Sequence, residues 1–186
     1  MAEATIDSVK APLYGELWER IGLEYLNAPL TPKDSVENQR VSDAWLVFAE
    51  FVVPQVAQLR EQLTIVEVDD ADPYPDTVAQ SADIAAGRFL VSRSHCEHPV
   101  WTSEQNIAFR IWHDVLGHHT HQLGFDRFGE LAVYAASCCL VKETNLRKVL
   151  FVELLAQTSA AVIAGEFVEQ KVYLSKTFGL LHGDDR

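Results

Sequence analysis

The chain has 186 residues, of which 48% are hydrophobic and 23% charged, as is typical of one soluble globular domain over residues 1–186. Its formal net charge of −12 argues against nucleic acid and anionic membrane surfaces as partners, because both are polyanions. The longest apolar stretches are interrupted well before the roughly 20 residues that a membrane-spanning helix needs.

Cysteine usage predicts the compartment. The chain has three cysteines, an odd number, and Cys138 and Cys139 are adjacent, which is a poor arrangement for pairing with each other. The N-terminal segment has no basic stretch followed by an apolar run, so we expect no signal peptide. Both observations favour a reduced, cytoplasmic protein.

Two helices are predicted at the start of the chain. Apolar residues recur at helical spacing over residues 12–26. Thr31 is a suitable N-cap, and Pro32 suits the first helical position, so a second helix is expected over about residues 32–62. Pro54 should kink this helix or split it in two.

Two short strands flank a short helix in the next part of the chain. Residues 64–68 (TIVEV) alternate in polarity and are rich in β-branched side chains, which predicts a strand. Asp76 can cap a short helix that ends near Gly87. Residues 88–94 (RFLVSRS) predict a second strand, and residues 95–101 a loop.

The second half of the chain predicts helices. Thr102 opens one in a capping box, and Gly117 is well placed to end it. Asp126 can cap a helix over residues 127–141, and a last long helix is expected over residues 145–173. The predicted fold is therefore mainly α, a single domain of five to six helices with at most a small two-stranded β element.

A cluster of histidines indicates a metal site in the segment FRIWHDVLGHHTH. His113 and His118 are five residues apart, which on a regular α-helix separates them by roughly 140°. A left-handed Gly117 would end the helix and turn His118 back toward His113. The pair can then bind one ion, whereas His119 and His121 are expected on the surface.

One carboxylate stands out as a third ligand. Glu153 is the single charge in the apolar run VLFVELLAQTSAAVIAG, and a lone buried carboxylate needs a metal, a cationic partner such as Arg110, or a proton. Gln157 lies one turn further along and could orient Glu153 or contact a substrate. Glu130, near the start of the helix that follows the cluster, is the second candidate.

The segment from His113 to Gln157 resembles the iron-binding core of the pterin-dependent aromatic amino acid hydroxylases. His113 and His118, with glycine before the second histidine, match that family's His-Glu-x-x-Gly-His motif, except that aspartate replaces the glutamate. Glu153, 35 residues after His118, falls near the family's third ligand. The resemblance implies Fe(II) in a two-histidine, one-carboxylate site, with a pterin as co-substrate in that family.

A second resemblance is to uncharacterised proteins of phages and mobile elements. It rests on the block HPVWTSEQNIAFRIWHDVLGHH followed by FGE. It names no reaction, and it implies that one site contains Asn106, Arg110, His113, Asp114, His118 and Glu130. Arg110 and Asp114 are four residues apart and could pair on one helix face.

The favoured interpretation is a metal-dependent enzyme, a mononuclear non-haem Fe(II) oxygenase that hydroxylates a small organic substrate. In it, His113, His118 and Glu153 hold the metal. Four residues around the metal are expected to be catalytic, by orienting the histidines or by binding substrate: Asp114, Glu130, Gln157 and Arg110.

Two alternatives remain open. One is an HD-type phosphohydrolase using Zn²⁺ or Mn²⁺, in which His113 and Asp114 act with an upstream histidine, His95 or His98, and with Asp126. The other is a non-enzymatic regulatory or interaction protein whose histidine and carboxylate network is structural. The apolar helices would also allow a homodimer.

Overall fold

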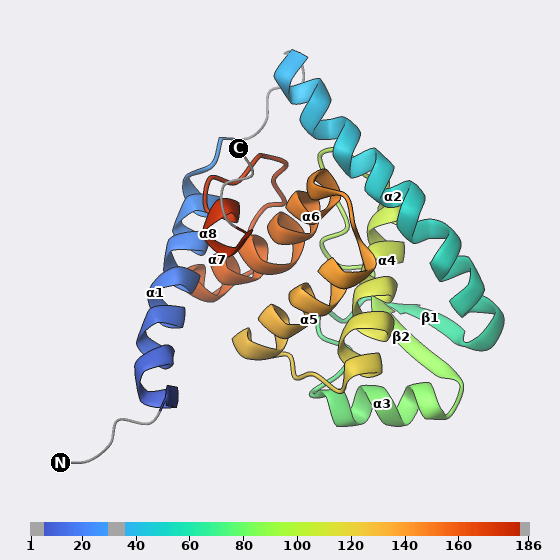
Figure 1. Ribbon diagram of the computed structural model, residues 1–186. Coiled ribbons are helices and arrows are strands. Elements are labelled where there is room, and N and C mark those ends of the chain that lie inside the picture. Colours follow the sequence, from blue (N-terminus) through green and yellow to red (C-terminus); the bar gives the residue numbers. More distant parts are fainter. Residues whose placement is uncertain (1–5, 30–35, 183–186) are drawn as a thin grey trace.

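The computed structural model describes residues 6–29 and 36–182 and is mainly helical, with one two-stranded sheet (Figure 1). The fold class is therefore as predicted. The elements in chain order are α1 (Ile6–Asn27), α2 (Val36–Gln62), β1 (Thr64–Val68), α3 (Thr77–Ala85), β2 (Arg88–Ser92), α4 (Ser103–Trp112), η1 (His113–His119), α5 (Arg127–Leu140), α6 (Thr144–Leu150), η2 (Phe151–Ala156), α7 (Gln157–Ala164) and α8 (Phe178–His182).

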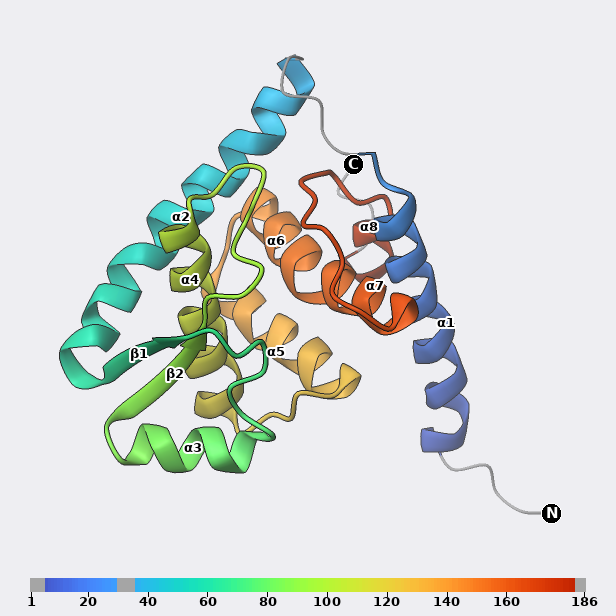
Figure 2. The ribbon, with the colours of Figure 1, turned by 180° about the vertical axis from the view of Figure 1, so that it is seen from behind.

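The two N-terminal helices lie on different sides of the molecule. α1 packs along α7, and α2 packs against α4 and α6. Figure 2 shows α1 and α7 on one side and the sheet with α3 on the other. α2 continues through Pro54, so of the two predicted outcomes, a kink or a split, the split does not occur. The predicted cap at Thr31 and Pro32 lies outside the described residues.

The two strands pair in parallel, with Thr64 opposite Arg88 and Val68 opposite Ser92. A parallel pair needs a crossover connection, and α3 provides it. The Asp76 side chain caps α3 by accepting a hydrogen bond from the Ala79 amide, as predicted. Gly87 has φ 78°, the left-handed conformation expected of a glycine after a helix end.

Two long helical stretches each contain a π-helical segment. α4 begins with the predicted capping box at Thr102 and continues directly into η1. α6, η2 and α7 form one continuous stretch that ends at Gly165, which has φ 75°. The predicted helix over residues 145–173 is therefore wrong beyond Ala164, because the left-handed Gly165 stops it and the chain continues irregularly to α8.

An aromatic cluster forms the core between α2 and α4. The Phe48 ring contacts the rings of Trp101, Phe109 and Trp112 with centroids 5.9 to 6.2 Å apart. Phe48 and Trp112 are almost completely buried, which places the C-terminal end of α4 firmly in the interior. The core therefore fixes the position at which η1 begins. No helix among the described residues is both long and apolar enough to cross a membrane.

Candidate metal centre

A π-helical turn brings the two predicted histidines together. In η1 each amide bonds to a carbonyl five residues earlier, so residues five apart lie about one turn apart on the same face. The Nε2 atoms of His113 and His118 are 3.1 Å apart. The histidine pair therefore forms without the helix end that was expected between its members.

The role expected of Gly117 needs correction. The glycines with positive φ in the described chain are Gly87 and Gly165, and Gly117 stays within η1. A Cβ on Gly117 would lie 2.6 Å from Cγ1 of Val133 on α5. The glycine is thus required by the close approach of α5 to η1 and not by a left-handed turn.

Hydrogen bonding leaves a lone pair of His118 available. Its Nδ1 lies 3.1 Å from the Leu123 carbonyl, which can only accept, so Nδ1 carries the proton. In the neutral ring Nε2 then carries the lone pair and faces His113 Nε2, which is the tautomer of a metal-binding imidazole oriented by a carbonyl. Burial lowers the pKa of His113 to about 4, so His113 is neutral near pH 7.

Two carboxylates approach this pair. Glu130 Oε1 lies 3.3 Å from His118 Nε2, and Glu130 Oε2 lies 3.6 Å from His113 Nε2. Asp114 Oδ1 lies 3.9 Å from His113 Nε2. Donor atoms of His113, Asp114 and His118 all lie within 4.8 Å of one another, so these residues form a group that could hold a metal ion.

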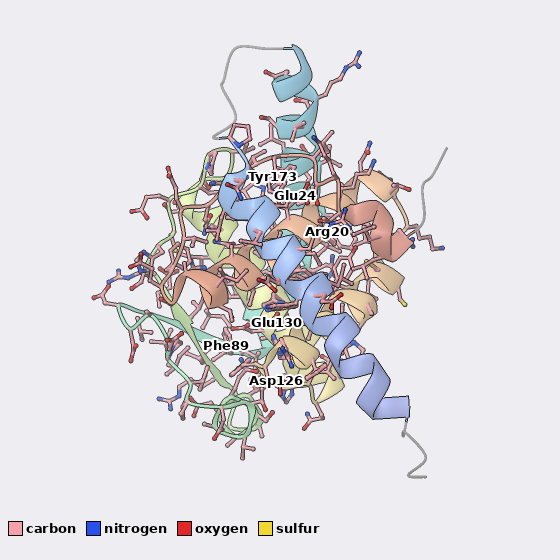
Figure 3. The ribbon with its side chains drawn as sticks, turned by 90° about the vertical axis from the view of Figure 1, so that its left-hand side faces the viewer. Arg20, Glu24, Phe89, Asp126, Glu130 and Tyr173 are labelled. Carbon is pink, nitrogen blue, oxygen red and sulfur yellow. The ribbon has the colours of Figure 1, made fainter. Side chains whose placement is uncertain are left out.

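The start of α5 positions Glu130. Asp126 caps this helix by accepting hydrogen bonds from the amides of Phe128 and Gly129. Figure 3 labels Asp126 and Glu130. A Cβ on Gly129 would lie 1.8 Å from the carbonyl oxygen of Gly124, so only glycine allows the loop to pass this closely. The tight turn places Glu130 in the first turn of α5, with its side chain buried against η1.

The separations fit the coordination sphere of one ion. Ligand atoms about 2.1 Å from a metal are about 3.0 to 3.4 Å from their neighbours in octahedral or tetrahedral geometry. The Nε2–Nε2 and Nε2–Oε1 separations of 3.1 and 3.3 Å lie in this range. Glu130 Oε2 is also buried without a hydrogen-bond partner in the described part of the chain, which is costly unless a cation neutralises it.

The charges in this cluster are strongly coupled. Burial raises the pKa of Asp114 to about 7, although the His118 charge opposes the rise. Burial disfavours a charge on His118, but its hydrogen bond to Glu130 and the Glu130 charge outweigh this and raise the pKa of His118. In the absence of metal, a proton can therefore be shared among groups that a cation would otherwise bridge.

Glu153 has partners other than those expected. It lies on η2, and its Oε1 accepts hydrogen bonds from Trp45 Nε1 at 2.6 Å and from His98 Nε2 at 3.3 Å. His98 Nδ1 accepts from the amides of Val100 and Trp101, so the His98 proton is on Nε2. His98 therefore acts as a donor to Glu153 and not as a metal ligand. No local pattern in the sequence predicts this contact.

The prediction that Glu153 is the third metal ligand stays a prediction. Among the described side chains, the possible metal ligands that cluster around His113 and His118 do not include the Glu153 carboxylate. It does line the same cavity as those histidines. The expected alternative partner, Arg110, contacts backbone carbonyls instead, those of Ser92, Ser94 and His95.

The set of ligands required by the HD-type alternative is not assembled. Asp126 caps α5, and His98 contacts Glu153. Neither joins the donor group of His113 and Asp114 within the part of the chain that the structure describes. Both His119 and His121 were expected on the surface. His121 is exposed, as predicted, whereas His119 is half-buried and its Nδ1 contacts the Ser81 hydroxyl.

A cavity of about 690 Å³ adjoins the metal candidates. This volume lies in the range typical of small-molecule sites. The predicted residues Arg110, Gln157, Glu130 and Glu153 all line it, together with the histidine pair. The structure thus brings every site residue of the favoured interpretation to one cavity. Gln80 on α3 also lines it and was not predicted, since nothing in its local sequence marks it.

Comparison of the chain with protein-family models, with curated proteins and with solved structures finds no match.

Proposed function

We propose that the protein is a mononuclear non-haem Fe(II) oxygenase that hydroxylates a small organic substrate, with His113, His118 and Glu130 as the metal ligands. The supporting observation is the set of Nε2 and carboxylate atoms 3.1 to 3.6 Å apart beside a cavity of about 690 Å³. Two imidazoles and one carboxylate are the ligands of the facial triad found in such oxygenases.

Glu130 is the preferred carboxylate ligand because of its distances from the histidine Nε2 atoms and because of its lack of other hydrogen-bond partners among the described residues. Both of its oxygens lie within 3.6 Å of a histidine Nε2, and one of them has no other partner. Glu153 Oε1 is already held by two N–H donors. Asp114 is further from His113 Nε2, at 3.9 Å, and is suited to orient that histidine or to exchange a proton near the metal.

Bound Fe(II) would supply oxygen binding and activation at the coordination positions that three protein ligands leave free. The chain's own residues orient the ligands and limit access by water. The Leu123 carbonyl fixes the His118 tautomer. The rings of Phe109 and Phe125 lie against His113 and His118, with centroids 6.1 and 4.8 Å apart, and form an apolar border to the site.

Metal analysis of untagged protein tests this proposal. We expect about one Fe(II) per chain after anaerobic loading, and a high-spin iron–nitrosyl EPR signal when nitric oxide is added as an oxygen surrogate. His118→Ala should lose the metal, whereas His121→Ala, which alters an exposed histidine, should retain it.

Other outcomes are informative. Tight binding of zinc or manganese without an iron–nitrosyl signal would support a metal-dependent hydrolase instead. Equal metal content in wild type and His118→Ala would exclude this site. An unchanged melting temperature with each metal would support the non-enzymatic alternative.

A further inference from the structure

Gln80 is a buried side chain with no hydrogen-bond partner. It lies on α3, is 0% exposed, and neither its Nε2 nor its Oε1 has a partner among the described residues. Burying a primary amide in this way costs free energy for both the donor and the acceptor. Gln80 also lines the cavity beside the metal candidates, so a small shift of its side chain toward that cavity would let a ligand satisfy both groups.

A second amide in the same cavity has an unused donor. Gln157, at the start of α7, has a buried Nε2 without a partner in residues 6–29 and 36–182. It comes from an element distant in sequence from α3, yet it lines the same cavity. By contrast, the amide of Asn106 in this cavity is paired, with the Cys96 carbonyl and Gln170. The unsatisfied amides are therefore not a general property of the cavity wall.

The charges of the wall disfavour an anionic ligand. Four carboxyl side chains line the cavity: Asp72, Asp114, Glu130 and Glu153. The one arginine in the wall, Arg110, already donates to three backbone carbonyls. A carboxylate or phosphate group would thus meet acidic side chains and no free guanidinium.

Aromatic rings also line the cavity. Phe109, Phe125 and Phe167 are all wall residues, and Phe167 stacks on His95 with centroids 4.3 Å apart. Such rings favour contact with a flat, unsaturated ligand. A flat molecule with adjacent N–H and C=O groups would match the ring surfaces and also the amide of Gln80.

We infer that the cavity binds a planar, uncharged small molecule that carries a primary carboxamide or lactam group. The Gln80 amide pairs with this group through two hydrogen bonds, one donated and one accepted, and Gln157 Nε2 donates a further one. This inference names the substrate class of the proposed oxygenase and rests on that function for the reaction, but the binding itself requires no metal.

Calorimetry on the full chain, before and after metal removal with a chelator, tests the inference with three probes. Nicotinamide carries the carboxamide, nicotinate replaces it with a carboxylate, and methyl nicotinate lacks the N–H donor. We expect nicotinamide to bind about tenfold or more tightly than either of the others, because each loses at least one hydrogen bond to Gln80.

The matched variants are Gln80→Leu and Gln58→Leu, the latter at an exposed position of α2. Gln80→Leu should weaken nicotinamide binding about tenfold while maintaining or raising the melting temperature, since it removes an unsatisfied buried amide. Gln58→Leu should change neither. A residue with a purely structural role would instead lower the melting temperature when replaced.

Equal affinity of the wild-type chain for the three probes, or no measurable binding of nicotinamide, would overturn the inference, and this readout does not depend on any variant folding. Nicotinamide binding that is unchanged by Gln80→Leu would also overturn it. Carboxamide binding without iron binding would refute only the proposed oxygenase, and iron binding without carboxamide preference would refute only the substrate class.

Discussion

His113 and His118 are five residues apart in the chain, yet their Nε2 atoms lie 3.1 Å apart on one face of η1. A π-helical turn makes this spacing equivalent to one turn. The candidate metal centre therefore depends on the local helical pitch as much as on the identity of its ligands. Variants that change the pitch should remove the metal even when every ligand is present.

Gly117→Ala should disturb this turn. The added Cβ would lie 2.6 Å from Val133 Cγ1, and overpacking of this kind costs about 1–3 kcal/mol. We expect a lower free energy of unfolding in urea and weaker metal retention. Adding Val133→Ala should relieve the clash, so the double variant should be less destabilised than the sum of the single variants. Strict additivity would contradict the contact.

Three carboxylate variants separate the candidate ligands. Glu130→Gln should reduce the metal content measured by elemental analysis to a small fraction, because an amide is a much poorer ligand than a carboxylate. Asp114→Asn should retain most of the metal with lower affinity, by about 10–100-fold, as expected for a residue that supports a ligand. Glu153→Gln should retain it fully. Metal loss in Glu153→Gln instead would establish Glu153 as the ligand.

Glu153 should contribute to stability through its two donors. Glu153→Leu leaves the N–H groups of Trp45 and His98 buried without an acceptor, at about 1–3 kcal/mol each. Glu153→Gln retains a side-chain oxygen that can accept from both. Urea denaturation should therefore find the leucine variant clearly less stable than the glutamine variant. Equal stabilities would mean that these hydrogen bonds contribute little.

Asp114 should make the metal-free protein less stable as pH rises. Its pKa is about 7 when folded, against 3.8 for the ordinary group, so only the unfolded chain loses this proton between about pH 4 and pH 7. The stabilisation is complete below pH 4 and is lost by about pH 7. Asp114→Asn should thus gain stability relative to wild type over this interval, by at most about 4 kcal/mol.

The control for this pH effect is Glu50→Gln at an exposed position of α2, which should follow the wild-type pH profile. Denaturation midpoints in urea at several pH values, with chelator present, provide the measurement. A difference between Asp114→Asn and wild type that does not vary with pH would rule out a raised pKa for Asp114.

The fold was largely predictable because its local signals are strong. The Thr102 capping box, the Asp126 cap and the alternation over residues 64–68 each depend on neighbouring residues, and each is present as expected. Gly165 was overlooked as a helix end because the apolar pattern around it is continuous. The parallel pairing of β1 and β2 also depends on contacts between distant segments.

The site was predictable only in part. His113 and His118 stand out by composition, but apolar residues at 107, 111 and 115 repeat every four positions, which predicts an α-helix and conceals the π-turn. Glu153 was correctly singled out as a buried carboxylate in need of a partner. That partner could not be inferred, because Trp45 and His98 lie 108 and 55 residues away.

A π-turn corresponds to one extra residue within an α-helix. Removing one residue between His113 and His118 would leave two histidines four apart, which a regular α-helix also places on one face. The two spacings thus differ by a single insertion and yield the same pair of imidazoles. Relatives that lack the extra residue would retain the ligands under a different motif, and a search restricted to either spacing would miss the other.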